Sequence, residues 1–150
     1  MTTWTCKTFD QLTPPELYDI LRLRSEVFVV EQNCVFLDMD NKDQYCHHII
    51  GRQEGRLLGY SRILRAGISY VESSIGRIVT SPAARRQGIG RELMVQSIRT
   101  LYDLYGITDI RIGAQYYLLS FYASFGFVQK GEIYLEDGIE HIEMLLTGRK

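Results

Sequence analysis

Cysteine is scarce in this sequence, and the few cysteines present do not form a disulfide or zinc framework. Cys6, Cys34 and Cys46 are far apart and include no CxxC pair. Disulfide-held domains carry even, closely spaced sets of cysteines, and structural zinc sites use paired cysteines or histidines. We therefore expect a reducing, cytoplasmic location and no metal site.

An excess of one charge sign is also absent. The 17 basic residues are balanced by 18 acidic residues, which leaves a formal net charge of −1. Domains that bind nucleic acid usually present a strong basic surface. Nucleic acid is therefore not an expected partner.

Long apolar runs are missing as well. No stretch reaches the roughly 18 apolar residues that a membrane-spanning helix needs. The opening MTTWTCKTFDQL has neither the basic start nor the apolar centre of a signal peptide. We expect a protein that is neither exported nor embedded in a membrane.

The chain otherwise has the composition of one globular domain. It has 150 residues, of which 45% are hydrophobic and 23% charged, and this is enough to bury one continuous core. No linker or internal repeat divides it, so residues 1–150 are predicted to form a single domain.

Hydrophobic periodicity predicts an alternation of strands and helices. Alternating or short apolar runs indicate strands, and a 3.6-residue period indicates helices. The expected strands are 4–9, 46–52, 57–65, 70–80, 107–114 and a hairpin of 127–135 with 142–146, and the expected helices begin at Pro14 and cover 88–105 and 117–125. Residues 33–45 are expected to form a loop or short helix, and the acidic residues 38–43 within it are expected to be a solvated loop. This order predicts an α/β domain with a mixed, mostly antiparallel sheet and helices on both faces.

A glycine-containing loop before the helix at 88–105 is the strongest chemical feature. The loop reads RRQGIG from Arg85 to Gly90 and follows the strand end I-V-T-S-P. A helix N-terminus offers unpaired N–H groups and positive partial charge, and glycine lets a phosphate approach closely. Arg85, Arg86 and Arg91 add charge. Alone, such a loop is equally compatible with a tight turn bearing solvated arginines.

These residues resemble a known family. R-x-x-G-x-G after I-V-T-S-P is similar to the acyl-CoA signature of the GNAT superfamily of N-acetyltransferases. Gln115 followed by SFYASFGF at 120–127 resembles a second family region, and RSEVFVVEQ at 24–32 with YLEDGIEH at 134–141 resembles the ElaA-type subgroup. The resemblance implies the GNAT fold and transfer of an acetyl group from acetyl-CoA to an amine of a small molecule or peptide.

The resemblance also implies a donor site. Backbone groups of one strand would pair with the pantetheine arm as an added strand, and N–H groups at the helix start would bind the pyrophosphate. The expected cofactor-binding residues are Ile78, Val79, Thr80, Arg85, Arg86, Gln87, Gly88, Ile89, Gly90, Arg91, Gln115 and Tyr122. Gln115 replaces an asparagine of many family members, and its extra methylene changes its reach.

Catalytic candidates follow from the same resemblance and from the titratable residues. Tyr122 matches the family tyrosine that faces the sulfur, so it is the expected general acid, although its spacing is also typical of a core residue. Candidates for the base are Glu31, His48, His141 and Glu143. Glu31 and His141 are kept as base or substrate contacts, and water is the alternative base.

Other functions stay open beside the amine acetyltransferase. One is a non-catalytic sensor of acyl-CoA. Another is an acyltransferase that uses longer acyl chains or forms a lactone, because V-F-V-x-E-Q at 27–32 is similar to a segment of that class. The acidic loop around Asp38 and the hairpin from Glu136 to Glu143 suggest a cationic acceptor. A homodimer also remains open.

Overall fold

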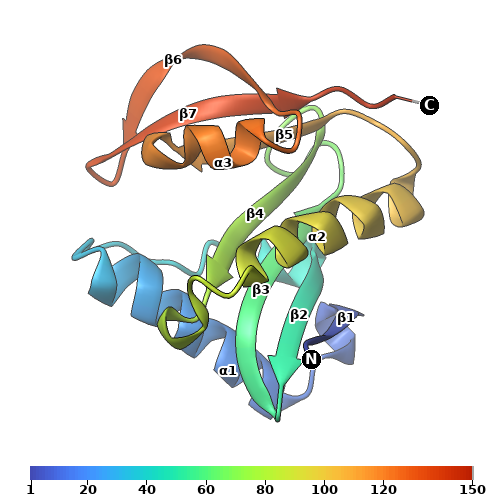
Figure 1. Ribbon diagram of the computed structural model, residues 1–150, viewed down its shortest axis with the longest axis vertical. Coiled ribbons are helices and arrows are strands. Elements are labelled where there is room, and N and C mark those ends of the chain that lie inside the picture. The colour runs from blue at the N-terminus through green and yellow to red at the C-terminus, as the bar shows by residue number, and fades with distance from the viewer. Residues whose placement is uncertain (150) are drawn as a thin grey trace.

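A seven-stranded sheet organises the computed structural model, which describes residues 1–149 (Figure 1). The strands are β1 Thr3–Thr8, β2 His47–Gln53, β3 Arg56–Leu64, β4 Ser73–Thr80, β5 Ile110–Gln115, β6 Val128–Glu136 and β7 Ile139–Leu146. They lie in the order β1-β2-β3-β4-β5-β7-β6. Every neighbouring pair is antiparallel except β4 with β5, which is parallel. The predicted mixed, mostly antiparallel sheet is confirmed.

Helices cover both faces of this sheet, as predicted. Helix α1, Pro14–Arg24, continues into a π-helical segment, Ser25–Glu31, and packs on one face. Helix α2, Ile89–Tyr105, and the short α3, Leu119–Ala123, pack on the other face (Figure 1). No helix in the described part of the chain is both long and apolar enough to cross a membrane. The same residues contain no cluster of three or more histidine, cysteine or acidic side chains suited to a metal ion.

Local sequence signals set the ends of several elements. Helix α1 begins at Pro14 because the Thr13 hydroxyl accepts from the Glu16 N–H at 3.3 Å, while the Thr13 N–H donates to the Glu16 carboxylate at 2.8 Å. The β2–β3 hairpin turns on Glu54 and Gly55, which have φ values of 53° and 77°. Positive φ at both central residues is the signature of a type I′ turn, and this turn is shorter than the predicted four-residue connection.

The two halves of the sheet diverge between β4 and β5. These strands share only two residue pairs, Ser73 with Ile110 and Ser74 with Arg111. In Figure 1, β4 continues downward with β2 and β3, while β5, β6 and β7 run across the top. No described strand pairs with the far part of β4, from Ile75 to Thr80, on its β5 side. An opening therefore lies along this edge of β4.

A β-bulge accompanies this divergence. Tyr60 and Arg62 of β3 lie two residues apart, but their partners Val79 and Gly76 in β4 lie three apart, so β4 contains one extra residue. Arg77 within this stretch has a φ of 50°. Bulges bend a strand and increase its twist, so this one turns the end of β4 away from β5.

The acidic residues 38–43 do not form a solvated loop, and that prediction was wrong. Asp38 and Asp43 are only 5% and 6% exposed. Arginines from α1, β3 and β4 reach into the loop and neutralise it: the ion pairs join Arg24 to Asp38 (2.8 Å) and Asp43 (2.8 Å), Arg62 to Asp43 (2.9 Å) and Asp40, and Arg77 to Asp38 (2.8 Å) and Asp40 (3.5 Å). We call these six residues the arginine–aspartate network. It fixes the loop against the sheet and cancels the loop's negative charge, which was one of the two acidic features from which a cationic acceptor was inferred.

Replacing Asp43 by asparagine should test this network. Burial alone would raise the pKa of Asp43, but Arg24 and Arg62 hold it below its ordinary value, so the carboxylate is charged at neutral pH. We expect Asp43→Asn to lower the free energy of unfolding by about 3 kcal/mol, because two buried guanidinium groups lose an anionic partner. Urea denaturation at pH 7.5 measures the change.

Asp19→Asn is the matched control, because Asp19 pairs with Arg52 at the surface and its side chain is 46% exposed. Its free energy of unfolding should change by less than about 0.5 kcal/mol. Equal effects of the two substitutions would contradict a stabilising role for the network.

Candidate active site

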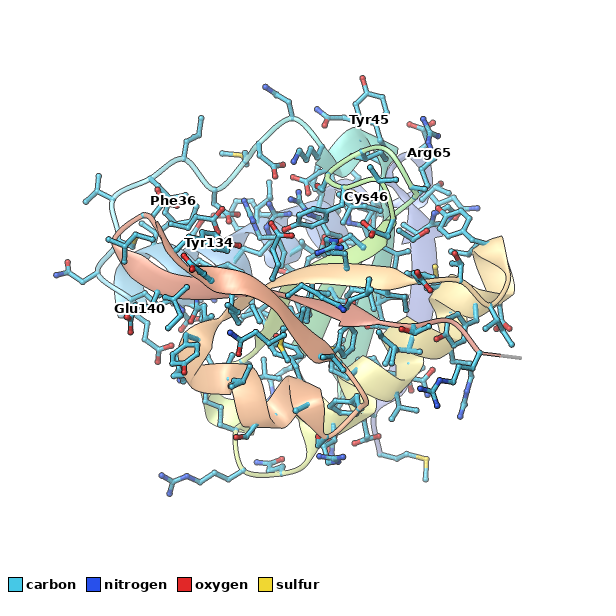
Figure 2. The ribbon with its side chains drawn as sticks, turned by 90° about the horizontal axis from the view of Figure 1, so that it is seen from above. Phe36, Tyr45, Cys46, Arg65, Tyr134 and Glu140 are labelled. Carbon is cyan, nitrogen blue, oxygen red and sulfur yellow. The ribbon has the colours of Figure 1, made fainter. Side chains whose placement is uncertain are left out.

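The opening beside β4 leads into a cleft with a volume of about 1010 Å³. The cleft follows β4 from Ser74 to Thr80, and its walls come from the π-helical segment, the loop of residues 34–42, the start of α2, α3 and the β6–β7 hairpin. Seen from above, the loop that carries Phe36 runs beside the hairpin that carries Tyr134 (Figure 2). The Cys34 thiol donates to the Asp137 carbonyl oxygen at 3.0 Å, which joins these two walls.

One end of the cleft meets the N-terminus of α2. Gly88 precedes this helix with a φ of 77°, and a side chain built there would meet nothing within 4 Å. Gly90 lines the cleft between Phe121 and Thr80. The first N–H groups of an α-helix have no partner within the helix and carry positive partial charge. This end of the cleft therefore offers an open, electropositive surface to an anion.

Two of the arginines around the glycines at the start of α2 have different partners. Arg85 forms a two-point ion pair with Glu31, at 2.7 and 2.6 Å, and both residues line the cleft. Arg91 turns toward α3, where it donates to the Ser124 hydroxyl at 3.2 Å and lies 4.7 Å from the centre of the Phe125 ring. The hydrogen bonds from Arg85 lower the pKa of Glu31, so Glu31 is a weak base.

Gln115 makes a reciprocal amide contact with Gln32. Each side-chain nitrogen donates to the oxygen of the other residue, at 3.3 and 3.2 Å, and both residues line the cleft. Gln32 follows the π-helical segment, and Gln115 ends β5. This pair therefore joins the end of the π-helical segment to the end of β5 beside the opening.

Tyr122 lies on α3 and lines the same cleft, although only 5% of the residue is exposed. Its ring packs edge-on against Phe121 and Phe127, with centroids 5.2 and 6.2 Å away. Burial raises the pKa of Tyr122 above its ordinary value, so the hydroxyl keeps its proton at neutral pH. Tyr122 thus belongs both to the core and to the cleft.

His141 on β7 also lines the cleft. Its Nδ1 lies 2.8 Å from the carbonyl oxygen of Ile139, and its Nε2 lies 3.3 Å from the Glu136 carboxylate. A carbonyl oxygen can only accept, so Nδ1 carries a proton and donates it. Nε2 is the ring nitrogen that lies beside the Glu136 carboxylate.

The other two base candidates lie outside this cleft. His48 is fully buried, and its ring nitrogens contact the Tyr60 hydroxyl at 2.6 Å and the Asp43 carbonyl oxygen at 3.0 Å. Glu143 forms an ion pair with Arg111 at 3.0 Å. The expectation that His48 and Glu143 flank the cleft was wrong, because both side chains hold neighbouring elements together instead.

Comparison with known proteins agrees with this geometry. Residues 21–147 match the family model of the acetyltransferase (GNAT) domain. The chain belongs to the GNAT family. A UPF0039 protein of Synechocystis is 39% identical over 143 residues, which cover 95% of this chain and 93% of the relative. ElaA of Escherichia coli K12 is 38% identical over 146 residues, which cover 96% of this chain and 95% of ElaA.

Solved structures show the same relationship for this GNAT-family chain. An acyl-CoA N-acyltransferase from Pseudomonas aeruginosa is 41% identical and superimposes with a TM-score of 0.92, covering 97% of this chain and 99% of that one. The Escherichia coli ElaA structure is 37% identical with a TM-score of 0.90 and the same coverage of both chains. The predicted GNAT fold and ElaA-type relationship are confirmed.

Several residues of this GNAT cleft were not found from the sequence. They are Phe28, Gln32, Phe36, Lys42, Arg62 and Tyr70, which all line the cleft. Arg62 did leave a signal, because a charged residue near the middle of the largely apolar strand RLLGYSRIL requires a buried partner. Phe28 and Gln32 lie in the ElaA-like segment 24–32, which was recognised as a resemblance but not as part of a cleft, and Phe36, Lys42 and Tyr70 lie in loops without a pattern.

Replacing His48 by glutamine should weaken the pH dependence of stability. Burial lowers the pKa of His48 below its ordinary 6.5, so the unfolded chain takes up a proton that the folded chain does not. The contribution of the neutral His48 to the free energy of unfolding is therefore complete above about pH 6.5. It falls as the pH drops, by up to about 1.4 kcal/mol per pH unit. Urea denaturation at pH 7.5, 6.5 and 5.5 should show a shallower decline in His48→Gln than in the wild type.

His47→Gln is the control for this measurement, since His47 is next in sequence and only half-buried. It should keep the wild-type slope. Identical slopes for His48→Gln and the wild type would show that the buried imidazole does not contribute as argued.

Proposed function

We propose that this protein transfers an acetyl group from acetyl-CoA directly to a primary amine of a small molecule or peptide. The observation that carries the proposal is that one cleft brings together the unpaired edge of β4, the N-terminus of α2 and Tyr122. Membership of the GNAT family, whose fold uses acyl-CoA, supports this interpretation of the cleft.

The residues along the cleft fit an acyl-CoA donor. The pyrophosphate would bind to the first N–H groups of α2, where Gly88 has no side chain to keep it away. The other residues expected to contact it are Arg85, Arg86, Gln87, Ile89, Gly90 and Arg91. The free edge at Ile78, Val79 and Thr80 would pair with the amide groups of the pantetheine arm. Gln115 would contact the donor only by exchanging its present partner, Gln32.

Tryptophan at position 88 should block the donor. Its side chain would fill the open space in front of the α2 N-terminus, so we expect Gly88→Trp to weaken acetyl-CoA binding at least about tenfold, measured by titration calorimetry. Gly55→Trp is a matched control, because Gly55 has the same φ of +77° and equally open surroundings, but it lies in the β2–β3 turn. Equal affinities of the two variants would contradict this location for the phosphates.

Three groups of the chain would then act on the transfer. A bound donor supplies an activated thioester. A backbone N–H near Val79 would polarise the carbonyl oxygen of the thioester, and Tyr122 would donate a proton to the departing sulfur. His141 would accept the proton of the amine at Nε2, with Glu136 beside it to stabilise the imidazolium. Glu31 suits this step less well, because its ion pair with Arg85 makes it a weaker base.

Removing the Tyr122 hydroxyl should slow transfer without weakening donor binding. Phenylalanine keeps the ring contacts with Phe121 and Phe127 but has no proton to donate. We expect Tyr122→Phe to lower kcat for thiol release about a hundredfold, with acetyl-CoA affinity unchanged within about threefold. Tyr117→Phe removes a hydroxyl from a cleft-lining residue that is 74% exposed, and it should behave as the wild type.

The same assay separates the alternatives. Tight acetyl-CoA binding without thiol release from any amine would favour an acyl-CoA sensor. Faster release from octanoyl-CoA than from acetyl-CoA would favour an acyltransferase for longer chains.

A further inference from the structure

The end of the cleft away from α2 contains a cation that no carboxylate neutralises. The basic residues lining the cleft are Lys42, Arg62, Arg77, Arg85 and His141. Arg62, Arg77 and Arg85 form ion pairs, and His141 lies beside Glu136. Among the described side chains, Lys42 has no acidic residue within ion-pair distance, and its ammonium group donates to the Ser69 hydroxyl at 3.0 Å.

The surroundings of Lys42 do not cancel its charge. In the arginine–aspartate network three arginines face three aspartates, so the network is balanced before Lys42 is counted. Arg62 also keeps one polar hydrogen unused: its side chain is 4% exposed, and its buried Nε has no acceptor among residues 1–149. This Nε faces Gly76, where a Cβ atom would lie 3.6 Å away, so no side chain separates it from the cleft-lining backbone. The local potential therefore favours an anion.

The β6–β7 hairpin gives another wall of the cleft a negative charge. Glu136 lines the cleft on β6 and lies beside His141. A series of close positions connects it to Lys42: the His141 ring lies 5.8 Å from that of Tyr134, the Tyr134 and Tyr70 hydroxyls lie together over Gly113, and Tyr70 follows Ser69. Both phenol oxygens would lie within 3.0 Å of a Cβ at Gly113, so this arrangement requires glycine on β5. The acceptor end is therefore negative on one side and positive on the other.

We propose that the acceptor is an amino acid or a related amine with a carboxylate, which Lys42 binds while the amine faces His141 and Glu136. A carboxylate suits this site better than a phosphate, because one ammonium group with neighbouring hydroxyls supplies one positive charge. The inference rests on the proposed acyl transfer and adds the class of its acceptor.

Paired acceptors provide the test. Thiol release from acetyl-CoA would be measured with methionine and 3-(methylthio)propylamine, phenylalanine and phenethylamine, and 6-aminohexanoate and pentylamine. The members of each pair differ only by the carboxylate. We expect kcat/KM to be at least tenfold higher for the carboxylate-bearing member of one or more pairs. Lys42→Gln should reduce this ratio toward one, mainly through KM, and Lys42→Arg should retain it.

Lys130→Gln, on the exposed outer strand β6, is the matched control and should keep the wild-type ratio. Equal or faster release with the carboxylate-free amine in every pair would overturn this inference and leave the proposed acyl transfer standing. A wild-type ratio in Lys42→Gln would overturn the role of Lys42. Absence of thiol release with every amine would overturn both the acceptor class and the acyl transfer.

Discussion

The short pairing between β4 and β5 is the constraint on which the rest of the site depends. Two residue pairs hold these strands together, and the extra residue near Arg77 then turns β4 aside. Strands that stayed paired would fill the opening with their own hydrogen bonds and side chains. Because they part, β4 keeps a row of unpaired backbone groups, and this edge is available to a ligand instead of another strand.

The arginine–aspartate network makes this opening compatible with a stable fold. A cleft through the middle of a sheet removes packing that the strands would otherwise share, so other contacts must hold its walls in place. Arg62 and Arg77 lie on the strands next to the cleft, and Arg24 lies on α1. Their aspartates all come from the loop of residues 38–43. Burying these charges is costly unless each one is paired, and this requirement gives the loop a defined position.

Local patterns therefore predicted the elements well, but not the contacts between distant segments. The sequence was enough to find the capping box at Thr13, the sustained 3.6-residue apolar pattern of α2 and the turn glycines. Each of these signals acts between residues that are close in sequence. The divergence at Ser74 and the pairing of Gln32 with Gln115 depend on how distant segments meet. The acidic loop was misjudged for the same reason, because its arginine partners lie 14 to 39 residues away in the sequence. The prediction of a donor site came from family resemblance, whereas the acceptor side has no comparable pattern.

The π-helical segment shows how one local irregularity serves both sides of the cleft. The backbone N–H of Gln32 bonds to the Val27 carbonyl oxygen, five residues earlier, and this wider turn ends α1 beside the opening. Glu31 then contacts Arg85 in the loop proposed to bind phosphate, while the next residue, Gln32, contacts Gln115 at the end of β5. Neighbouring side chains thus contact the two regions proposed to hold the donor. Because Val27 and Phe28 of the same segment also line the cleft, one helical irregularity supplies part of the cleft wall and both of these contacts.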